Sequence, residues 1–263
     1  MGKPMQMIVH AGFHKTGTTT VQKALRLNRV ALTPYVKIIL RSDMVAVCET
    51  ARGYSASKDV LDLALFQYEL AQLAEGWDAS DTRPILLASE DLAGHMPGRH
   101  RLTSYAATPQ LMQTLVETLA EVRRDTQAQL FFSTRTADSW LASCYVQHLR
   151  TTRITQTVDE YTSAYRDSAR LGGIIDQVAD AVTPHPVHHC ALESSQSRSL
   201  GPLDPLLDLI GLPNTVRAGL VPHPPANISS SQAKIDQMLA LNRSNLGAKA
   251  WRAAKSALLK HQG

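Results

Sequence analysis

The sequence of 263 residues predicts an α/β fold in which one central parallel sheet carries helices on both faces, giving three layers. Short apolar runs alternate along the chain with longer segments whose apolar residues recur every three or four positions, as in amphipathic helices. Short turns join these segments. The run at 84–89 is apolar at successive positions, which is typical of a central parallel strand buried on both faces.

The first half of the chain contains three of the expected strands. The first is an apolar, β-branched run that ends at Gly12, and a helix is expected from Thr18 to about Ala31. Asp43 is placed to cap a short helix. An amphipathic stripe predicts a longer helix over 59–76, which Gly76 is placed to end. The other two strands cover 35–40 and 84–89.

The second half continues the alternation after a loop at 90–108 that has neither a helical nor a strand period. Its expected elements are a helix at 111–122, a strand at 130–134, a helix at 137–150, helical segments at 158–180, a strand at 187–192 and a helix at 204–210. The proline-rich segment 221–231 predicts an irregular connection. We expect a single domain over 1–263, with a C-terminal helical extension at 229–261.

Composition and charge narrow the classes of protein. The apolar fraction of 44% and charged fraction of 19% are ordinary for a globular protein, and a net charge of +4 suits a small anionic ligand. The bases are scattered among few aromatics, which argues against a nucleic-acid partner. The C-terminal bases, Arg243, Lys249, Arg252 and Lys255, are expected to form a solvated face. With no long apolar run, we expect a cytoplasmic protein without stable membrane insertion.

The three cysteines, Cys48, Cys144 and Cys190, are widely spaced and include no Cys-x-x-Cys pair. This pattern indicates neither a disulfide framework nor a zinc site. We expect them to be buried small apolar residues.

A candidate anion site follows the first strand, in the run Phe13-His14-Lys15-Thr16-Gly17-Thr18-Thr19-Thr20. A polar turn between a strand and a helix directs backbone N–H groups and the positive end of the helix at one point, to which Lys15 adds a full charge. The P-loop of nucleotide triphosphatases requires a Gly-Lys-Ser/Thr run. Here Lys15 precedes Gly17, so the loop is P-loop-like with a different sequence.

A second candidate anion site follows the fourth strand. Arg135 ends that strand, and Ser143 lies eight positions later, inside the next helix. A guanidinium fork together with a hydroxyl suits a dianionic phosphate. Ligands of parallel sheets bind beyond the carboxyl ends of the strands, which directs attention to the Lys15 loop, Glu90 and Arg135 after strands one, three and four.

Together the two motifs resemble those of the sulfotransferases that use 3′-phosphoadenylyl sulfate (PAPS). In that family a Lys-x-Gly-Thr-Thr run opens the first helix, and an Arg that ends a strand is followed, after seven intervening residues, by a Ser. The resemblance extends over about 5–215, and the spelling Gly-Phe-His-Lys-Thr-Gly-Thr-Thr is more similar to bacterial carbohydrate or lipid sulfotransferases than to the cytosolic animal enzymes.

The resemblance implies which residues bind PAPS. The 5′-phosphosulfate is assigned to Lys15, Thr16, Gly17, Thr18 and Thr19, with Thr20 as a further candidate and His14 shaping the loop. The 3′-phosphate is assigned to Arg135 and Ser143. The Arg-Lys-Gly run that many members place against the 3′-phosphate is missing, so Arg243, another C-terminal base, or no residue takes its place.

The reaction that the resemblance implies is in-line transfer of a sulfuryl group to an acceptor hydroxyl. Lys15 suits the bridging oxygen, where charge accumulates. The family places a His or Glu just past the third strand as general base, which favours Glu90, with His95 second and His14 third. No metal is expected, because no His/Asp/Glu cluster has ligand spacing.

Three hypotheses remain open: a sulfotransferase, a nucleotide kinase or NTPase that would need magnesium, and a non-catalytic relative that keeps the nucleotide site. The segments 90–108 and 151–180 are expected to line the acceptor pocket. Their polar and aromatic residues suit a carbohydrate or other small polar or lipid-linked hydroxyl compound, although phenols and lipid head groups fit nearly as well. The sequence leaves the oligomeric state open.

Overall fold

The computed structural model describes residues 5–124, 126–224 and 231–260. The chain divides into two compact units, one comprising Met1–Arg135 and Arg170–Ala226, the other Thr136–Ala169 and Asn227–Gly263. We describe each unit by itself. The expectation of a single domain stays a prediction, because compact units within one chain need not fold separately.

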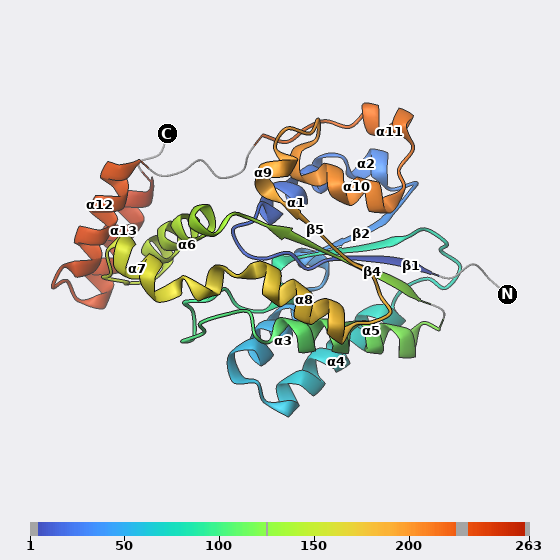
Figure 1. Ribbon diagram of the computed structural model, residues 1–263, viewed down its shortest axis with the longest axis horizontal. Coiled ribbons are helices and arrows are strands. Elements are labelled where there is room, and N and C mark those ends of the chain that lie inside the picture. Colours follow the sequence, from blue (N-terminus) through green and yellow to red (C-terminus); the bar gives the residue numbers. More distant parts are fainter. Residues whose placement is uncertain (1–4, 125, 225–230, 261–263) are drawn as a thin grey trace. The chain divides into compact units, whose positions relative to one another are not determined.

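The first unit contains a five-stranded, all-parallel sheet in the order β2-β3-β1-β4-β5, which confirms the predicted fold class (Figure 1). The strands are β1 (Gln6–His10), β2 (Lys37–Leu40), β3 (Ile85–Ala88), β4 (Gln127–Thr134) and β5 (Val187–Ala191). In the central strand, Val9 aligns with Leu87 of β3 and Leu130 of β4. The three strand ends singled out by the sequence are therefore neighbours in the sheet.

The burial of the strands follows their positions. Every residue of β3 is buried, as the sequence predicts for an interior strand with two covered faces. The edge strand β5 is half-buried to exposed along its length. Cys190 of this strand is accordingly only partly buried, contrary to the expectation, whereas Cys48 and Cys144 are buried as expected, and all three are free thiols.

Helices cover both faces of this sheet. Figure 1 shows α1, α2 and α10 on one face and α3, α4, α5 and α8 on the other. The helices of the first unit are α1 (Thr18–Leu27), α2 (Arg29–Leu32), α3 (Val45–Ser57), α4 (Val60–Glu75), α5 (Thr108–Val122), α8 (Leu171–Ala181), α9 (Leu192–Ser195), α10 (Asp204–Ile210) and α11 (Asn214–Ala218). On the first face, Val21 and Leu25 of α1 join Ile8, Phe131 and Leu206 in one apolar core.

One local expectation in this unit was wrong. The first helix ends at Leu27 because the Asn28 amide donates to the carbonyls of Ala24 and Val221 and accepts the Val221 N–H, which turns the chain. Asp43 caps a short helix as expected: it belongs to the 3₁₀ helix η1 (Arg41–Asp43) and accepts the N–H of Leu40, the N-cap residue of η1. The loop at 90–108 also begins with a 3₁₀ helix, η2 (Glu90–Ala93), while η4 spans Gly201–Leu203.

The second unit is helical. It contains α6 (Ala137–Thr151), α7 (Val158–Tyr165), η3 (Asp167–Ala169), α12 (Gln232–Arg243) and α13 (Ala248–Lys260). The expected irregular connection at 221–231 falls largely outside the described residues, which omit 225–230.

The expectation of a solvated basic face was wrong at Lys255, whose residue exposure is 4%. Its ammonium donates to Asn242 Oδ1 at 2.5 Å and lies 5.0 Å from the centre of the Trp251 ring. Burial lowers the pKa of Lys255 to about 8. The spacing of basic residues along the sequence cannot distinguish this buried lysine from its exposed neighbours Lys249 and Arg252. The burial of Lys255 depends on which face of α13 packs against α12.

Candidate functional site

The loop between β1 and α1 turns through three left-handed residues. These are Gly12, Lys15 and Gly17, with φ angles of 54°, 68° and 97°. A Cβ atom on Gly12 would lie 2.6 Å from Thr18 Cγ2, so only glycine fits that close approach. Backbone that alternates between left- and right-handed residues forms a concave nest of N–H groups, which is a binding site for anions.

The start of α1 adds its positive end to this nest. Gly17 occupies the N-cap position without a side-chain hydrogen bond, and the first turn of α1 contains no acidic residue. The N–H groups of Thr20 and Val21 bond to the Gly17 carbonyl, whereas the first N–H groups of a helix have no acceptor within it. An anion is therefore the natural partner of this helix end.

The threonines of the motif differ in surroundings. Thr16 is fully buried, and its hydroxyl donates to the Phe13 carbonyl at 2.6 Å, which fixes the turn and leaves the backbone N–H as its group for a ligand. Thr18 and Thr20 are buried, and Thr19 is exposed. The threonines of the motif are therefore not equivalent: the Thr16 hydroxyl stabilises the turn, whereas Thr19 lies at the surface.

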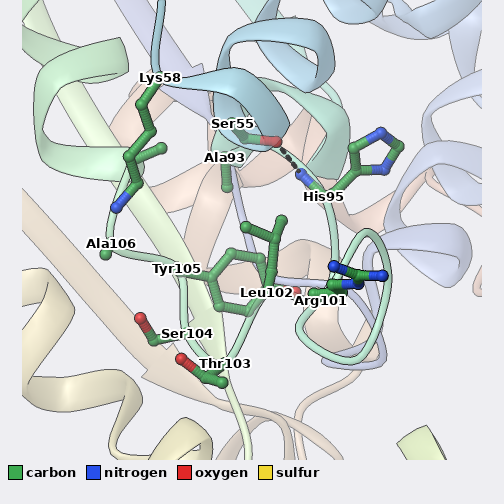
Figure 2. A pocket seen from close by; sticks show the side chains of 11 residues that line it. Ser55, Lys58, Ala93, His95, Arg101, Leu102, Thr103, Ser104, Tyr105 and Ala106 are labelled. Carbon is green, nitrogen blue, oxygen red and sulfur yellow. Dashed lines mark hydrogen bonds between the residues drawn. The ribbon is translucent and has the colours of Figure 1, made fainter.

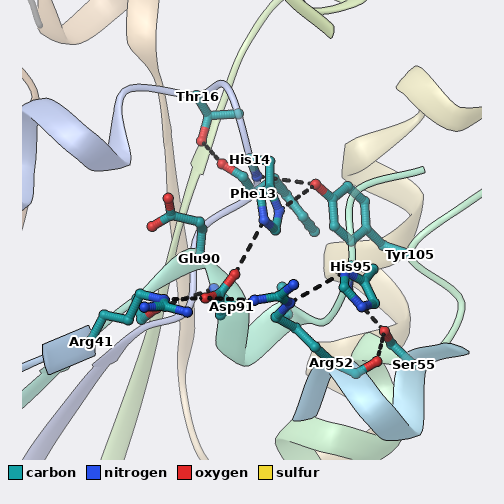
Figure 3. A network of polar contacts seen from close by, with 12 residues as sticks. Phe13, His14, Thr16, Arg41, Arg52, Ser55, Glu90, Asp91, His95 and Tyr105 are labelled. Atoms are coloured by element: carbon teal, nitrogen blue, oxygen red, sulfur yellow. Dashed lines mark hydrogen bonds and ion pairs between the residues drawn. The ribbon is translucent and has the colours of Figure 1, made fainter. Parts of the chain in front are cut away.

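Tyr105 holds the loop from the other side. Phe13 is fully buried between the rings of Tyr105, at 4.7 Å, and Phe132, at 5.2 Å. The His14 backbone N–H donates to the Tyr105 oxygen at 3.0 Å, and His14 Nδ1 lies 3.1 Å from the same oxygen (Figure 3). In the tautomer with the ring proton on Nε2, Nδ1 accepts the proton of the Tyr105 hydroxyl.

Asp91 faces that Nε2 proton. One carboxylate oxygen lies 3.4 Å from His14 Nε2, while the other accepts from Arg41 Nε at 2.6 Å and lies 3.8 Å from Arg52 (Figure 3). Burial raises the pKa of Asp91, but the hydrogen bonds of His14 and Arg41 and the charge of Arg52 outweigh it and lower the pKa to about 2. The carboxylate stays ionised and orients His14.

Arg135 reaches the same loop from the end of β4. Its Nη1 lies 3.4 Å from the Lys15 carbonyl oxygen, and its Nε lies 3.9 Å from Glu193 Oε1. Because β1 and β4 pair in parallel, with His10 aligned to Phe131, their loops emerge side by side. Two motifs separated by 120 positions thus share one edge of the sheet. Ser143 is half-buried on α6 in the second unit, and its part in this site stays a prediction.

Glu90 lies at the third of these strand ends. One of its carboxylate oxygens accepts from Gln22 Nε2 of α1 at 2.6 Å, which fixes the carboxylate beside the helix that the loop opens. Glu90 is half-buried. Its position is compatible with the predicted base, because the second carboxylate oxygen has no hydrogen-bond partner within the described part of the chain.

His95 lies farther along the same loop and is 7% exposed. Its backbone N–H donates to Ser55, its Nδ1 accepts from Arg52 at 3.3 Å, and its ring lies 4.4 Å from that of His100. Burial, followed by the charges of Arg52 and His100, lowers the pKa of His95 to about 4. A histidine with this pKa is neutral at pH 7 and is a weak base.

His10 and Ser133 join the ends of β1 and β4. His10 is 1% exposed, and its Nε2 lies 2.8 Å from Ser133 Oγ. Burial lowers the pKa of His10 to about 4, so this is a neutral polar pair. The sequence analysis missed this pair, as it missed Asp91 and Tyr105. Asp91 could have been found, because it follows Glu90 directly after a buried strand. His10 and Tyr105 are not part of any motif with a recognisable spacing in the sequence.

Within 5–124, 126–224 and 231–260, no group of three or more His, Cys, Asp or Glu side chains is arranged to hold a metal ion. Over the same ranges, no helix has the length and apolar content needed to span a membrane.

Comparisons with known proteins concern the fold. No family model matches the chain, and no curated protein matches it. Among solved structures, the chain is similar to a sulfotransferase from Alicyclobacillus acidocaldarius, at 14% identity and a TM-score of 0.46, over 96% of this chain and 100% of that one.

Proposed function

We propose that this protein is a sulfotransferase that moves the sulfuryl group of PAPS to a hydroxyl group of an acceptor. The observation that carries the proposal is the 3.4 Å approach of Arg135 to the Lys15 carbonyl, because it joins the two anion motifs at one edge of the sheet. PAPS has an anionic group at each end of its ribose, so it needs two cationic sites close together.

The residues present fit such a ligand. The nest from Gly12 to Gly17, the Lys15 ammonium and the uncapped start of α1 would hold the 5′-phosphosulfate. The fit at Gly12 is tight, since a Cβ there would lie 2.6 Å from Thr18. Arg135 would hold the 3′-phosphate with its guanidinium, which lies 3.9 Å from Glu193 Oε1.

Bound PAPS supplies a sulfuryl group attached to a phosphate leaving group. The acceptor oxygen forms a bond to sulfur while the bond from sulfur to the bridging oxygen breaks, and the electron pair stays on the 5′-phosphate of 3′,5′-ADP. Lys15 stabilises the charge on that oxygen. Glu90 takes the proton that the acceptor hydroxyl loses. This scheme requires no metal ion.

Glu90 is a better base than His95. The Gln22 hydrogen bond fixes the Glu90 carboxylate beside α1 and leaves an oxygen for the acceptor. In His95 the Nδ1 lone pair already accepts from Arg52. His14 has Tyr105 and Asp91 at its two ring nitrogens, which supports its role in shaping the loop.

Titration of 3′,5′-ADP tests the proposal without knowledge of the acceptor. Calorimetry without magnesium should give binding to the wild type that weakens by about 10- to 100-fold in Arg135→Ala, the loss of a charge-assisted contact. Arg26→Ala removes an exposed arginine of α1 and should bind like the wild type. Absence of 3′,5′-ADP binding to the wild type, with magnesium-dependent ATP turnover, would replace the proposal with a nucleotide kinase.

A further inference from the structure

A cavity of about 200 Å³ lies beside Tyr105, within the first unit. Its walls come from the end of α3 and from the loop that follows η2, and include Ser55, Lys58, His95, Arg101 and Tyr105. Figure 2 shows Lys58 extending from α3 towards Ala106, with Arg101 on the other side of Leu102 and Tyr105. The volume is below the 300–1,000 Å³ of most ligand pockets, so it suits a compound of about one sugar ring.

The cavity adjoins the loop from Gly12 to Gly17, called the phosphate loop below, through one side chain. Tyr105 lines the cavity, and its hydroxyl bonds to the backbone N–H and to Nδ1 of His14, the residue before Lys15. A compound in this cavity would therefore lie one side chain away from the loop that is proposed to hold the sulfuryl donor. The sequence analysis expected the segment 90–108 to line the acceptor pocket, and most of this cavity wall comes from that segment.

The charge of the cavity wall has one sign. Its lining residues include Lys58 and Arg101 but neither Asp nor Glu. The nearest acids along the chain have other partners: Asp59 accepts the Leu61 N–H, and Asp62 accepts the Ser57 hydroxyl. Within the part of the chain that the structure describes, neither Lys58 nor Arg101 forms an ion pair with an Asp or Glu side chain.

The backbone presents both bases from unusual conformations. Lys58 ends α3 with φ 55°, a position that glycine or asparagine usually fills, and Arg101 has φ 61°. Left-handed residues other than glycine are uncommon, and they gather at ligand sites where the surrounding structure holds them. Lys58 and Arg101, the two basic residues of the cavity wall, both have this left-handed conformation.

We propose that this cavity binds the acceptor and that the acceptor carries an anionic group, such as a carboxylate, besides the hydroxyl that is sulfonated. The inference rests on the proposed function, which supplies the donor. The anionic group binds at one of the two bases, Lys58 and Arg101, which lie on opposite sides of Leu102 and Tyr105, and the part of the acceptor that carries the hydroxyl extends past Tyr105 to the donor. The substrate class is thus a small acidic hydroxyl compound or an acidic sugar unit at the end of a larger chain.

A pair of probes that differ in one group tests the inference. Methyl glucuronoside and methyl glucoside differ only by a carboxylate in place of a hydroxymethyl group, and each is titrated by ligand-observed NMR into the protein saturated with 3′,5′-ADP. We expect the glucuronoside to bind about tenfold tighter or more, and this preference to shrink as salt is added.

Variants link the preference to the cavity. Lys58→Met combined with Arg101→Met should remove the preference while 3′,5′-ADP affinity stays that of the wild type, and Lys58→Arg should retain the preference. Lys23→Met removes an exposed base of α1 and is the matched control. Equal binding of the two probes, binding of neither, or a preference that survives in the double variant would overturn the inference. Failure of 3′,5′-ADP itself to bind would instead contradict the proposed function.

Discussion

In the proposed reaction, Lys15 is the residue on which the chemical step depends most directly. It lies in the left-handed turn between β1 and α1, and its carbonyl contacts Arg135, so its backbone is fixed. Charge develops on the bridging oxygen only as the bond to sulfur breaks. A cation at that oxygen therefore stabilises the transition state more than the bound ground state.

Replacing Lys15 by Met should lower kcat by about 10²- to 10³-fold, the usual cost of losing one donor at a developing charge. The affinity for 3′,5′-ADP should fall by about tenfold or less. Release of 3′,5′-ADP from PAPS in the presence of an acceptor measures the first quantity, and calorimetry measures the second. Lys23→Met is the control on α1. A variant that loses affinity while keeping the wild-type kcat would show that Lys15 only binds.

At the same scale, the sequence predicted which residues gather and missed how they are oriented. Lys15, Glu90 and Arg135 could be selected because each follows a strand of a parallel sheet. Asp91 takes partners from the end of β2, from α3 and from the phosphate loop, at Arg41, Arg52 and His14. No spacing along the chain encodes such contacts, because they arise only when the sheet brings distant segments together.

At the scale of the element, the strand–loop–helix unit depends on Gly12. Its φ of 54° and the 2.6 Å approach to Thr18 leave no room for a Cβ. Gly12→Ala should destabilise the protein by about 1–3 kcal/mol, the usual cost of a side chain held in a strained conformation. It should also weaken 3′,5′-ADP binding by tenfold or more, because Thr18 or the nest must move. Urea unfolding and calorimetry measure these effects.

Gly53→Ala is the matched control for Gly12→Ala. Gly53 lies within α3, and nothing lies within 4 Å of the position that its Cβ would take. Alanine in a helix is favoured over glycine by about 1 kcal/mol, so this variant should be as stable as the wild type or more so. It should bind 3′,5′-ADP normally. Normal nucleotide affinity in Gly12→Ala would contradict the assignment of this loop to the phosphosulfate.

The elements themselves were largely predictable, since apolar period and capping residues are local. Asp59 accepts the Leu61 N–H at the start of α4, as its place before an amphipathic stripe suggests. The early end of α1 was not predictable. It depends on hydrogen bonds between Asn28 and Val221, which are 193 positions apart, and on no breaker residue near the helix end.

At the scale of the whole molecule, the sheet order makes β1 the central strand and buries the His10 side chain under the loop. The central position of β1 places the phosphate loop between the ends of β3 and β4. The same position buries the titratable ring of His10 away from water. Desolvation lowers the pKa of His10 from 6.5 to about 4. Organisation of the site and the acid sensitivity of the fold therefore have a common structural cause.

The free energy of unfolding should fall as the pH drops from 6.5 to 4. In this window the unfolded chain protonates His10 and the folded chain does not, so the unfolded state binds more protons and gains stability. The contribution of His10 is complete above pH 6.5, and it is lost at about 1.4 kcal/mol per pH unit until the folded pKa is reached. The total is about 3 kcal/mol.

Urea unfolding followed by circular dichroism at pH 7.5, 6.0, 5.0 and 4.5 measures this dependence. His10→Gln keeps a polar group near Ser133 but does not titrate, so its free energy of unfolding should depend less steeply on pH, by about one proton. His189→Gln changes an exposed histidine of β5 and should keep the wild-type dependence. Identical slopes in His10→Gln and the wild type would mean that His10 is protonated within the folded chain. The description of His10 and Ser133, at the ends of β1 and β4, as a neutral pair would then be wrong.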